Sequence, residues 1–176
     1  MILIAVMVIL TACSKSNTNE NPSTESEPNI PVVDNSELVV AIPNDLFRTD
    51  PTWDSNGSSR NVYINSYERI LAFDENGNVV PSLVKDYVHL DAHTWEFTLR
   101  DDALFWDGSP VTAEDVKYTI ERAAQDETSR LTTYVASVDD VQVISDNQFR
   151  IITKNPDVTL PNRLANVFVV SKASAA

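Results

Sequence analysis

The stretch TWEFTLR, Thr94–Arg100, sets the narrowest limit on the fold, because its side chains alternate between apolar and polar. Successive side chains of a strand point to opposite faces, so Trp95, Phe97 and Leu99 would share one face. The pattern predicts a strand with one buried and one solvated face. The stretch VQVISDNQFRIIT, residues 141–153, predicts two further strands joined by an Asp-Asn turn.

Helical and turn signals accompany these strands. Apolar residues recur at helical spacing between Asn61 and Leu71, which predicts a helix there. Asn76-Gly77, flanked by apolar residues, predicts a turn or hairpin. The short apolar run 37–42 predicts a buried strand at the start of the folded part. Strand, helix, strands, helix and hairpin follow one another without an internal repeat, so the predicted fold class is α/β, and α+β over this length.

The segment FWDGSPVTAEDV, residues 105–116, gathers carboxylates that could belong to a catalytic or metal site. Asp107-Gly108 is, however, a turn dipeptide, and Thr112 followed by Asp115 has the spacing of a helical capping box. The segment lacks the alternating ligands of a calcium loop, and nothing supplies the apolar pocket of a glycosidase acid. We therefore interpret it as a turn, a cap and a helix start, without contact to a ligand.

A second candidate metal site is HLDAH, His89–His93. Two histidines at this spacing would bind zinc if the segment were helical. The segment lacks the glutamate of the H-E-x-x-H motif, and it runs directly into the strand that begins at Thr94. Two exposed polar residues beside a turn at Asp91 are the favoured interpretation. A secreted metal-dependent enzyme that uses His89 and His93 remains the alternative.

Composition excludes several classes of protein. The 176 residues carry a formal net charge of −13, with a pI near 4.4, which argues against binding nucleic acid or anionic lipid. The three glycines, Gly57, Gly77 and Gly108, are not spaced for a phosphate-binding loop. There is no G-x-S-x-G elbow, and the single cysteine allows no intrachain disulfide and no multi-cysteine zinc site.

That cysteine follows the uncharged apolar run MILIAVMVIL. The run is too short to span a bilayer but suits a signal peptide, and Leu10–Cys13 resembles a bacterial lipobox. We expect residues 1–13 to be a lipoprotein signal peptide that ends at a lipidated Cys13. No Lys or Arg precedes the apolar run, which departs from the usual pattern. A short buried segment with an incidental cysteine is the alternative.

Residues 14–36 are rich in Ser, Asn, Glu, Thr and Pro and nearly free of large apolar side chains. Such a stretch cannot bury enough surface to offset its conformational entropy, so we expect a disordered tether. The folded part is then residues 37–176. Within it, Trp53 lies in the polar loop TWDSNGSS, where it would either contact a ligand or fold back onto the body of the protein.

Taken together, these stretches resemble the start of the family 5 extracellular solute-binding proteins, the oligopeptide-, dipeptide- and nickel-binding proteins of ABC importers. The resemblance runs in order from about Glu37 to Ser174. Arg69, where glycine is common, and Val84, where alanine is common, depart from the pattern. The matching motifs are Asp50-Pro51, Tyr67–Ile70, Asn76-Gly77, Pro81–Val84, Thr94–Arg100, Phe105–Gly108 and Thr112–Val116.

The resemblance implies a type II periplasmic-binding-protein fold, in which two lobes close on a ligand. Members are about three times this length, so the chain would supply part of the first lobe plus an accessory subdomain. It implies a monomeric, lipid-anchored, extracytoplasmic receptor without catalytic residues, metal or cofactor, which hands peptides to an ABC permease and ATPase. Nickel chelates or sugars are alternative ligands. The implied ligand contacts are Trp53, Asp54, Ser55, Asn56, Gly57 and Tyr134.

Overall fold

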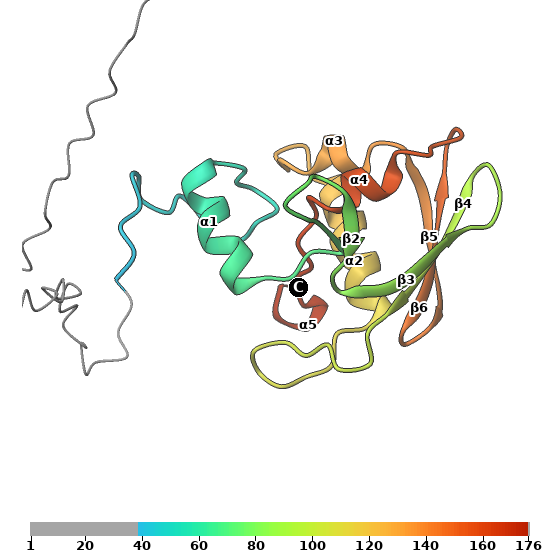
Figure 1. The fold of residues 1–176 in the computed structure, drawn as a ribbon, viewed down its shortest axis with the longest axis horizontal. Helices are drawn as coiled ribbons and strands as arrows, with labels where there is room; N and C mark the ends of the chain where they lie inside the picture. The colour runs from blue at the N-terminus through green and yellow to red at the C-terminus, as the bar shows by residue number, and fades with distance from the viewer. Residues whose placement is uncertain (1–38, 176) are drawn as a thin grey trace, which may run out of the picture. The chain divides into compact units, whose positions relative to one another are not determined.

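The computed structural model describes residues 39–175 of the chain. The predicted signal peptide, its lipidation at Cys13 and the predicted tether at residues 14–36 lie outside the described residues. Residues from Ala41 onward form one compact unit. Its elements, shown in Figure 1, are α1 (Gly57–Ser66), β1 (Leu71–Phe73), β2 (Val79–Pro81), β3 (Val84–His89), β4 (Thr94–Leu99), α2 (Ala113–Gln125), α3 (Thr132–Val135), β5 (Val138–Ser145), β6 (Gln148–Thr153), α4 (Leu160–Leu164) and α5 (Lys172–Ala175).

Four strands form an antiparallel sheet in the order β3-β4-β6-β5 (Figure 1). The predicted strand at 94–100 is confirmed as β4, whose side chains alternate between buried and half-buried. The predicted hairpin is confirmed as β5 and β6, joined by two residues. Phe97 of β4 lies opposite Phe149 of β6, and their rings stack with centroids 5.1 Å apart. The apolar face of this sheet forms one side of the core.

Helix α2 provides much of the other side of the core. Val116, Ile120 and Ala123 recur at helical spacing and are at most 1% exposed. The predicted capping box at Thr112 is present. The carboxylate of Asp115 accepts from the amide of Thr112 at 2.9 Å, and also from the amide of Lys172 at 2.9 Å. The acids of the segment at 105–116 therefore start a helix, as predicted, and also tie it to the C-terminal part of the chain.

The predicted helix at 61–71 has the wrong bounds, since α1 runs from Gly57 to Ser66. Asn56 starts it early, because its side chain accepts from the amide of Ser58 at 2.9 Å. The chain then becomes extended at Tyr67, where the residues that follow pair with a distant segment. The amide of Ile70 donates to the carbonyl of Val167 at 3.1 Å. Ile70 and Leu71 are fully buried as the spacing implied, but outside the helix, Ile70 at a bend and Leu71 in β1.

The Asn76-Gly77 turn is confirmed between β1 and β2. The carboxylate of Asp74 accepts from the amides of Asn76 and Asn78 at 2.9 and 2.8 Å, which closes the turn. Gly77 has φ of +81°, a left-handed conformation that glycine adopts without steric cost. The hydrogen bonds to this carboxylate hold the pKa of Asp74 below its usual value, and the bond from the Asn78 side chain contributes most.

The predicted buried strand at 37–42 is wrong over its described part. Residues 39–42 form no strand, and Val39 and Val40 are 82% and 68% exposed. An apolar run becomes a buried strand only where a neighbouring strand satisfies its amides and carbonyls. Within residues 39–175 no strand pairs with this run. Among the same residues, no helix combines the length and the apolar character that crossing a bilayer demands.

Candidate functional site

The loop between Thr49 and Gly57 is held from two sides. Just after α1, the hydroxyl of Tyr67 donates to the carbonyl of Thr49 at 2.9 Å. From α2, the guanidinium of Arg122 forms an ion pair with Asp50 at 2.7 Å. Burial is the main cause that raises the pKa of Tyr67 above 10.0, and the charge of Asp50 adds to it, so this phenol remains a donor at neutral pH. The base of the loop is thereby fixed to α2 and to the residue that follows α1.

Trp53 folds back onto the end of α2, as one of the two sequence interpretations proposed. Its indole N–H donates to Oδ2 of Asp126 at 2.6 Å, and the guanidinium of Arg122 lies 4.0 Å from the centre of its ring. The ring stays partly exposed. Hydrogen bonding from the Thr128 side chain, and to a lesser degree from Trp53, lowers the pKa of Asp126. Trp53 therefore has a fixed orientation while one part of its ring still meets solvent.

The next residues shape the loop with their own side chains. Asp54 accepts from the amide of Asn56 at 2.8 Å and also from the hydroxyl of Ser59. Asn56 caps α1, so its side-chain oxygen is occupied as well. Ser55 and Gly57 are exposed, and among residues 39–175 the side chain of Ser55 makes no hydrogen bond. The loop offers a ligand the backbone around Ser55 and Gly57 and the open part of the Trp53 ring.

This loop borders a cavity of about 350 Å³, which we call the loop pocket. It brings together three of the six predicted contact residues, and it adds cationic and aromatic side chains that the sequence analysis did not single out. The lining residues are Phe47, Arg48, Trp53, Asp54, Asn56, Thr128 and Arg130.

Tyr134 is not brought to the loop pocket. It lies in α3, is half-buried, and packs against the hydrophobic core. It lines neither the loop pocket nor the larger cleft described next. Within residues 39–175, Tyr134 therefore does not share a pocket with Trp53, Asp54 and Asn56.

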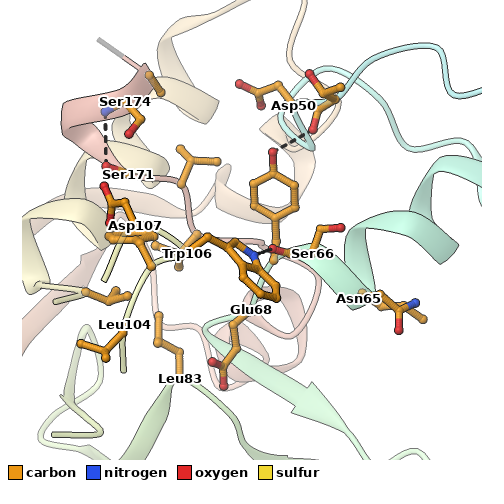
Figure 2. Close-up of a pocket in the computed structure, with 18 of the residues that line it drawn as sticks. Asp50, Asn65, Ser66, Glu68, Leu83, Leu104, Trp106, Asp107, Ser171 and Ser174 are labelled. Atoms are coloured by element: carbon orange, nitrogen blue, oxygen red, sulfur yellow. Dashed lines mark hydrogen bonds between the residues drawn. The ribbon is translucent and has the colours of Figure 1, made fainter. Parts of the chain in front are cut away.

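A larger cleft of about 960 Å³ lies beside the base of the same loop (Figure 2). Its walls come from Thr49 and Asp50, from residues 64–68, from residues 104–107 and from the C-terminal segment between Val169 and Ala175. The cleft thus gathers segments that are far apart in the sequence. We call it the large cleft.

The wall formed by residues 104–107 was not predicted from the sequence. Trp106 is 89% exposed, and its indole N–H donates to the carbonyl of Ser66 at 2.8 Å, a contact that Figure 2 shows. The segment expected to be only a turn and a cap thus contributes Phe105, Trp106 and Asp107 to a cleft. One signal could have indicated this wall: Trp106 is a large aromatic residue beside an Asp-Gly turn and belongs to no apolar periodicity.

The two histidines both have structural contacts beside the β3–β4 turn. The ring of His89 stacks on Trp95 with centroids 4.2 Å apart. The Nδ1 atom of His93 lies 2.9 Å from the carbonyl oxygen of Thr153. Asp91 closes the turn by accepting from the amide of His93 at 2.8 Å. Within residues 39–175 no three His, Cys, Asp or Glu side chains converge in a way that could hold a metal ion.

The folded unit is similar in sequence to known proteins. The sequence model described as bacterial extracellular solute-binding proteins, family 5 Middle, matches residues 78–175, more than half of the chain. The periplasmic oligopeptide-binding protein OppA of Salmonella typhimurium is 26% identical over 147 residues, which cover 80% of this chain and 26% of that protein. The nickel-binding periplasmic protein of Escherichia coli is 45% identical over 49 residues, which cover 27% of this chain and 9% of that protein.

Solved structures share the fold. The structure of OppA from Burkholderia pseudomallei superposes with a TM-score of 0.69 and 25% identity, over 76% of this chain and 30% of that one. The predicted α/β class and type II periplasmic-binding-protein fold are confirmed on this comparison. The chain spans about a quarter or less of the length of the two relatives named above.

Proposed function

The chain belongs to the family 5 bacterial extracellular solute-binding proteins, and from this premise we propose that it captures peptides outside the cytoplasmic membrane for an ABC importer. The observation that carries the proposal is the similarity to an oligopeptide-binding protein along 80% of the chain. Neither the loop pocket nor the large cleft needs a catalytic group for this role, and we propose none.

The geometry of the loop supports a ligand with an extended main chain. Its base is fixed to Tyr67 and to α2, so little conformational entropy would be lost on binding. Exposed backbone at Ser55 and Gly57 can pair with peptide amides and carbonyls, as in other modes of peptide recognition. The open part of the Trp53 ring can cover an apolar side chain. We therefore propose residues 53–57 as the contact surface and assign Tyr134 to packing around α3.

The proposal includes the surroundings of the protein. Cys13 would carry a lipid that anchors the receptor to the membrane, and residues 14–36 would separate the anchor from the folded unit. The receptor would work as a monomer and deliver its peptide to a permease driven by an ATPase. Replacing Cys13 with Ala should move the protein from the membrane fraction to the soluble extracytoplasmic fraction. Unchanged fractionation would contradict the anchor.

Calorimetric titration tests the ligand class. The protein, expressed from its complete reading frame, is titrated with a library of di- to pentapeptides, with a nickel–histidine chelate and with simple sugars. We expect binding of peptides only. If the protein binds the nickel chelate or a sugar but no peptide, that compound replaces peptides as the proposed ligand. The nickel chelate is included because the chain is similar to a nickel-binding protein.

Two matched tryptophan variants locate the site. Trp53→Ala should weaken peptide binding about 30-fold, because aromatic anchors at an interface contribute about 2 kcal/mol or more. Trp106→Ala is the control, since Trp106 is exposed in the large cleft and not in the loop pocket. Thermal melts of both variants show whether the fold is retained. If peptide binding weakens in Trp106→Ala and not in Trp53→Ala, the contact surface is the large cleft and not the loop.

A further inference from the structure

Two arginine side chains that line the loop pocket have no carboxylate partner among residues 39–175. The chain has 26 acidic and 13 basic residues other than histidine, so a cation would be expected to find a carboxylate. Arg100, Arg122, Arg150 and Arg163 each do so. Among residues 39–175, neither Arg48 nor Arg130 forms an ion pair or a side-chain hydrogen bond, and both line the loop pocket.

The backbones of these two arginines are nevertheless held in place. The carbonyl of Arg48 accepts from the hydroxyl of Tyr63 at 2.7 Å. The amide of Arg130 donates to the carbonyl of Thr52 at 2.9 Å. Both residues are exposed, and both contribute to the wall of the pocket. The two guanidinium groups are thus available to a ligand while the chain that bears them is anchored.

One carboxylate, that of Asp54, also lines the pocket. Its oxygens already accept from the amide of Asn56 and from the hydroxyl of Ser59, so it serves the shape of the loop. The lining residues thus include two guanidinium groups and a single carboxylate that is already hydrogen-bonded. The aromatic side chains of Phe47 and Trp53 supply apolar surface beside that charge.

Two other arginines show what a purely structural role looks like. Arg60 and Arg69 also lack a carboxylate partner within residues 39–175, but both guanidinium groups lie less than 6 Å from the ring centre of Phe168. Arg60 donates to the side chain of Asn166 at 3.0 Å, and Arg69 donates to the carbonyl of Ala165 at 3.3 Å. These contacts cover a buried ring. Within the described residues, Arg48 and Arg130 make no comparable contacts.

We propose that the loop pocket receives a carboxylate of the transported solute, held by Arg48 and Arg130. This inference rests on the proposed function and specifies its ligand as an anionic peptide. A guanidinium group presents planar, paired donors that match the two oxygens of a carboxylate. A volume of about 350 Å³ is small for a whole ligand but adequate for one acidic end or side chain. The carboxylate is either that of an acidic side chain or that of the peptide C-terminus.

Three peptides distinguish these two sources. The protein, expressed from its complete reading frame, is titrated with Ala-Glu-Ala, with Ala-Gln-Ala and with the C-terminal amide of Ala-Gln-Ala. Loss of the carboxylate that occupies the pocket should weaken binding about 10-fold, the scale of a charge-assisted hydrogen bond. Weaker binding of Ala-Gln-Ala than of Ala-Glu-Ala identifies a side-chain carboxylate as the group in the pocket. Weaker binding of the amidated Ala-Gln-Ala than of the free peptide identifies the C-terminal carboxylate.

Matched variants assign the effect to the pocket. In the double variant that combines Arg48→Gln and Arg130→Gln, the affinity difference between the two peptides that the wild type distinguishes should shrink to less than about twofold. A neutral amide retains hydrogen bonding but loses the charge. Arg60→Gln, which removes an arginine outside the pocket, should keep the wild-type discrimination. Raising the salt concentration should weaken binding of the wild type to peptides that carry the recognised carboxylate and leave its binding to the other peptides unchanged. This readout uses the wild type alone, so it does not depend on whether a variant folds.

Each outcome decides between the proposals. Equal affinity of the wild type for all three peptides would overturn the carboxylate pocket and leave peptide capture intact. Discrimination that survives in the double variant would likewise overturn the role of the two arginines. Failure of the wild type to bind any of these peptides or any member of the wider library would overturn the proposed function and this inference with it.

Discussion

The ion pair between Asp50 and Arg122 fixes the base of the loop, and its strength can be measured by a double-mutant cycle. The two groups lie 2.7 Å apart, with side chains only 25% and 15% exposed. A Coulomb energy of about 4 kcal/mol applies to a pair at about 4 Å with an effective dielectric constant near 20. Desolvation and the loss of side-chain freedom oppose it. Hydrogen bonds to charged groups contribute about 1.5–3 kcal/mol net, so we expect a coupling energy of about 2 kcal/mol.

The variants are Asp50→Asn, Arg122→Gln and the double variant. Asn preserves the oxygen that accepts from the amide of Thr52 at 2.8 Å, so the turn itself is retained. The free energy of unfolding of each protein is measured by urea denaturation followed by circular dichroism. The cycle removes the separate contribution of the Arg122 guanidinium over the Trp53 ring, because that contact is lost equally in the two proteins that carry Arg122→Gln.

The pair of Lys172 with Glu114 is the matched control. Its two groups are 2.9 Å apart, almost as close, but their side chains are 54% and 53% exposed. Exposed pairs contribute about 0–1 kcal/mol, so its coupling energy should be about 0.5 kcal/mol or less. A coupling energy for Asp50 and Arg122 no larger than that of the control would refute the claim that burial gives this pair its strength and that it fixes the loop.

Further predictions concern single residues. Asp115→Ala should lower the free energy of unfolding by about 2–4 kcal/mol in a urea melt, because it leaves the part-buried amides of Thr112 and Lys172 without their acceptor. A change under about 1 kcal/mol would contradict this. Gly77→Ala should destabilise the same protein by about 1–2 kcal/mol because φ is +81°, whereas Gly57→Ala, in the first turn of α1, should be neutral or stabilising. The lowered pKa of Asp126 predicts stability that is present above its ordinary value of 3.8 and is lost as the pH falls through its lower folded pKa. Tryptophan fluorescence followed from about pH 7 to about pH 2 should therefore show an acid transition that is smaller in Asp126→Asn, and equal transitions would oppose the link to Trp53.

Much of the fold was predictable because its signals are local. The alternation at 94–100 predicted β4, and the Asn-Gly and Asp-Asn dipeptides predicted turns at the correct places. The spacing from Thr112 to Asp115 predicted the start of α2. In each case neighbouring residues alone supply the periodicity, the turn conformation or the cap. The early start of α1 was equally local, since Asn56 precedes it, but the apolar spacing downstream drew the prediction away from it.

The candidate site was predictable only in outline. The loop at residues 53–57 stood out by its composition and by the family resemblance, and it does border a cavity. The cationic part of that cavity did not stand out, because Arg48 and Arg130 are 82 positions apart and neither belongs to a motif. Trp106 was not predicted to line a cleft, because the acids around it were fully explained by a turn and a helix cap.

The sequence by itself determined where β4, the β5–β6 hairpin, the Asn-Gly turn and α2 lie, since those choices depend on side chains a few positions apart. Tertiary structure decided which distant partners these local elements meet. Trp53 folds back because Asp126, 73 positions later, accepts its indole N–H. Residues 39–42 remain unpaired within the described chain, whereas the amide of the buried Ile70, outside α1, donates to the carbonyl of Val167. Such contacts depend on how distant elements pack, and a local pattern carries no information about which distant partner will be there.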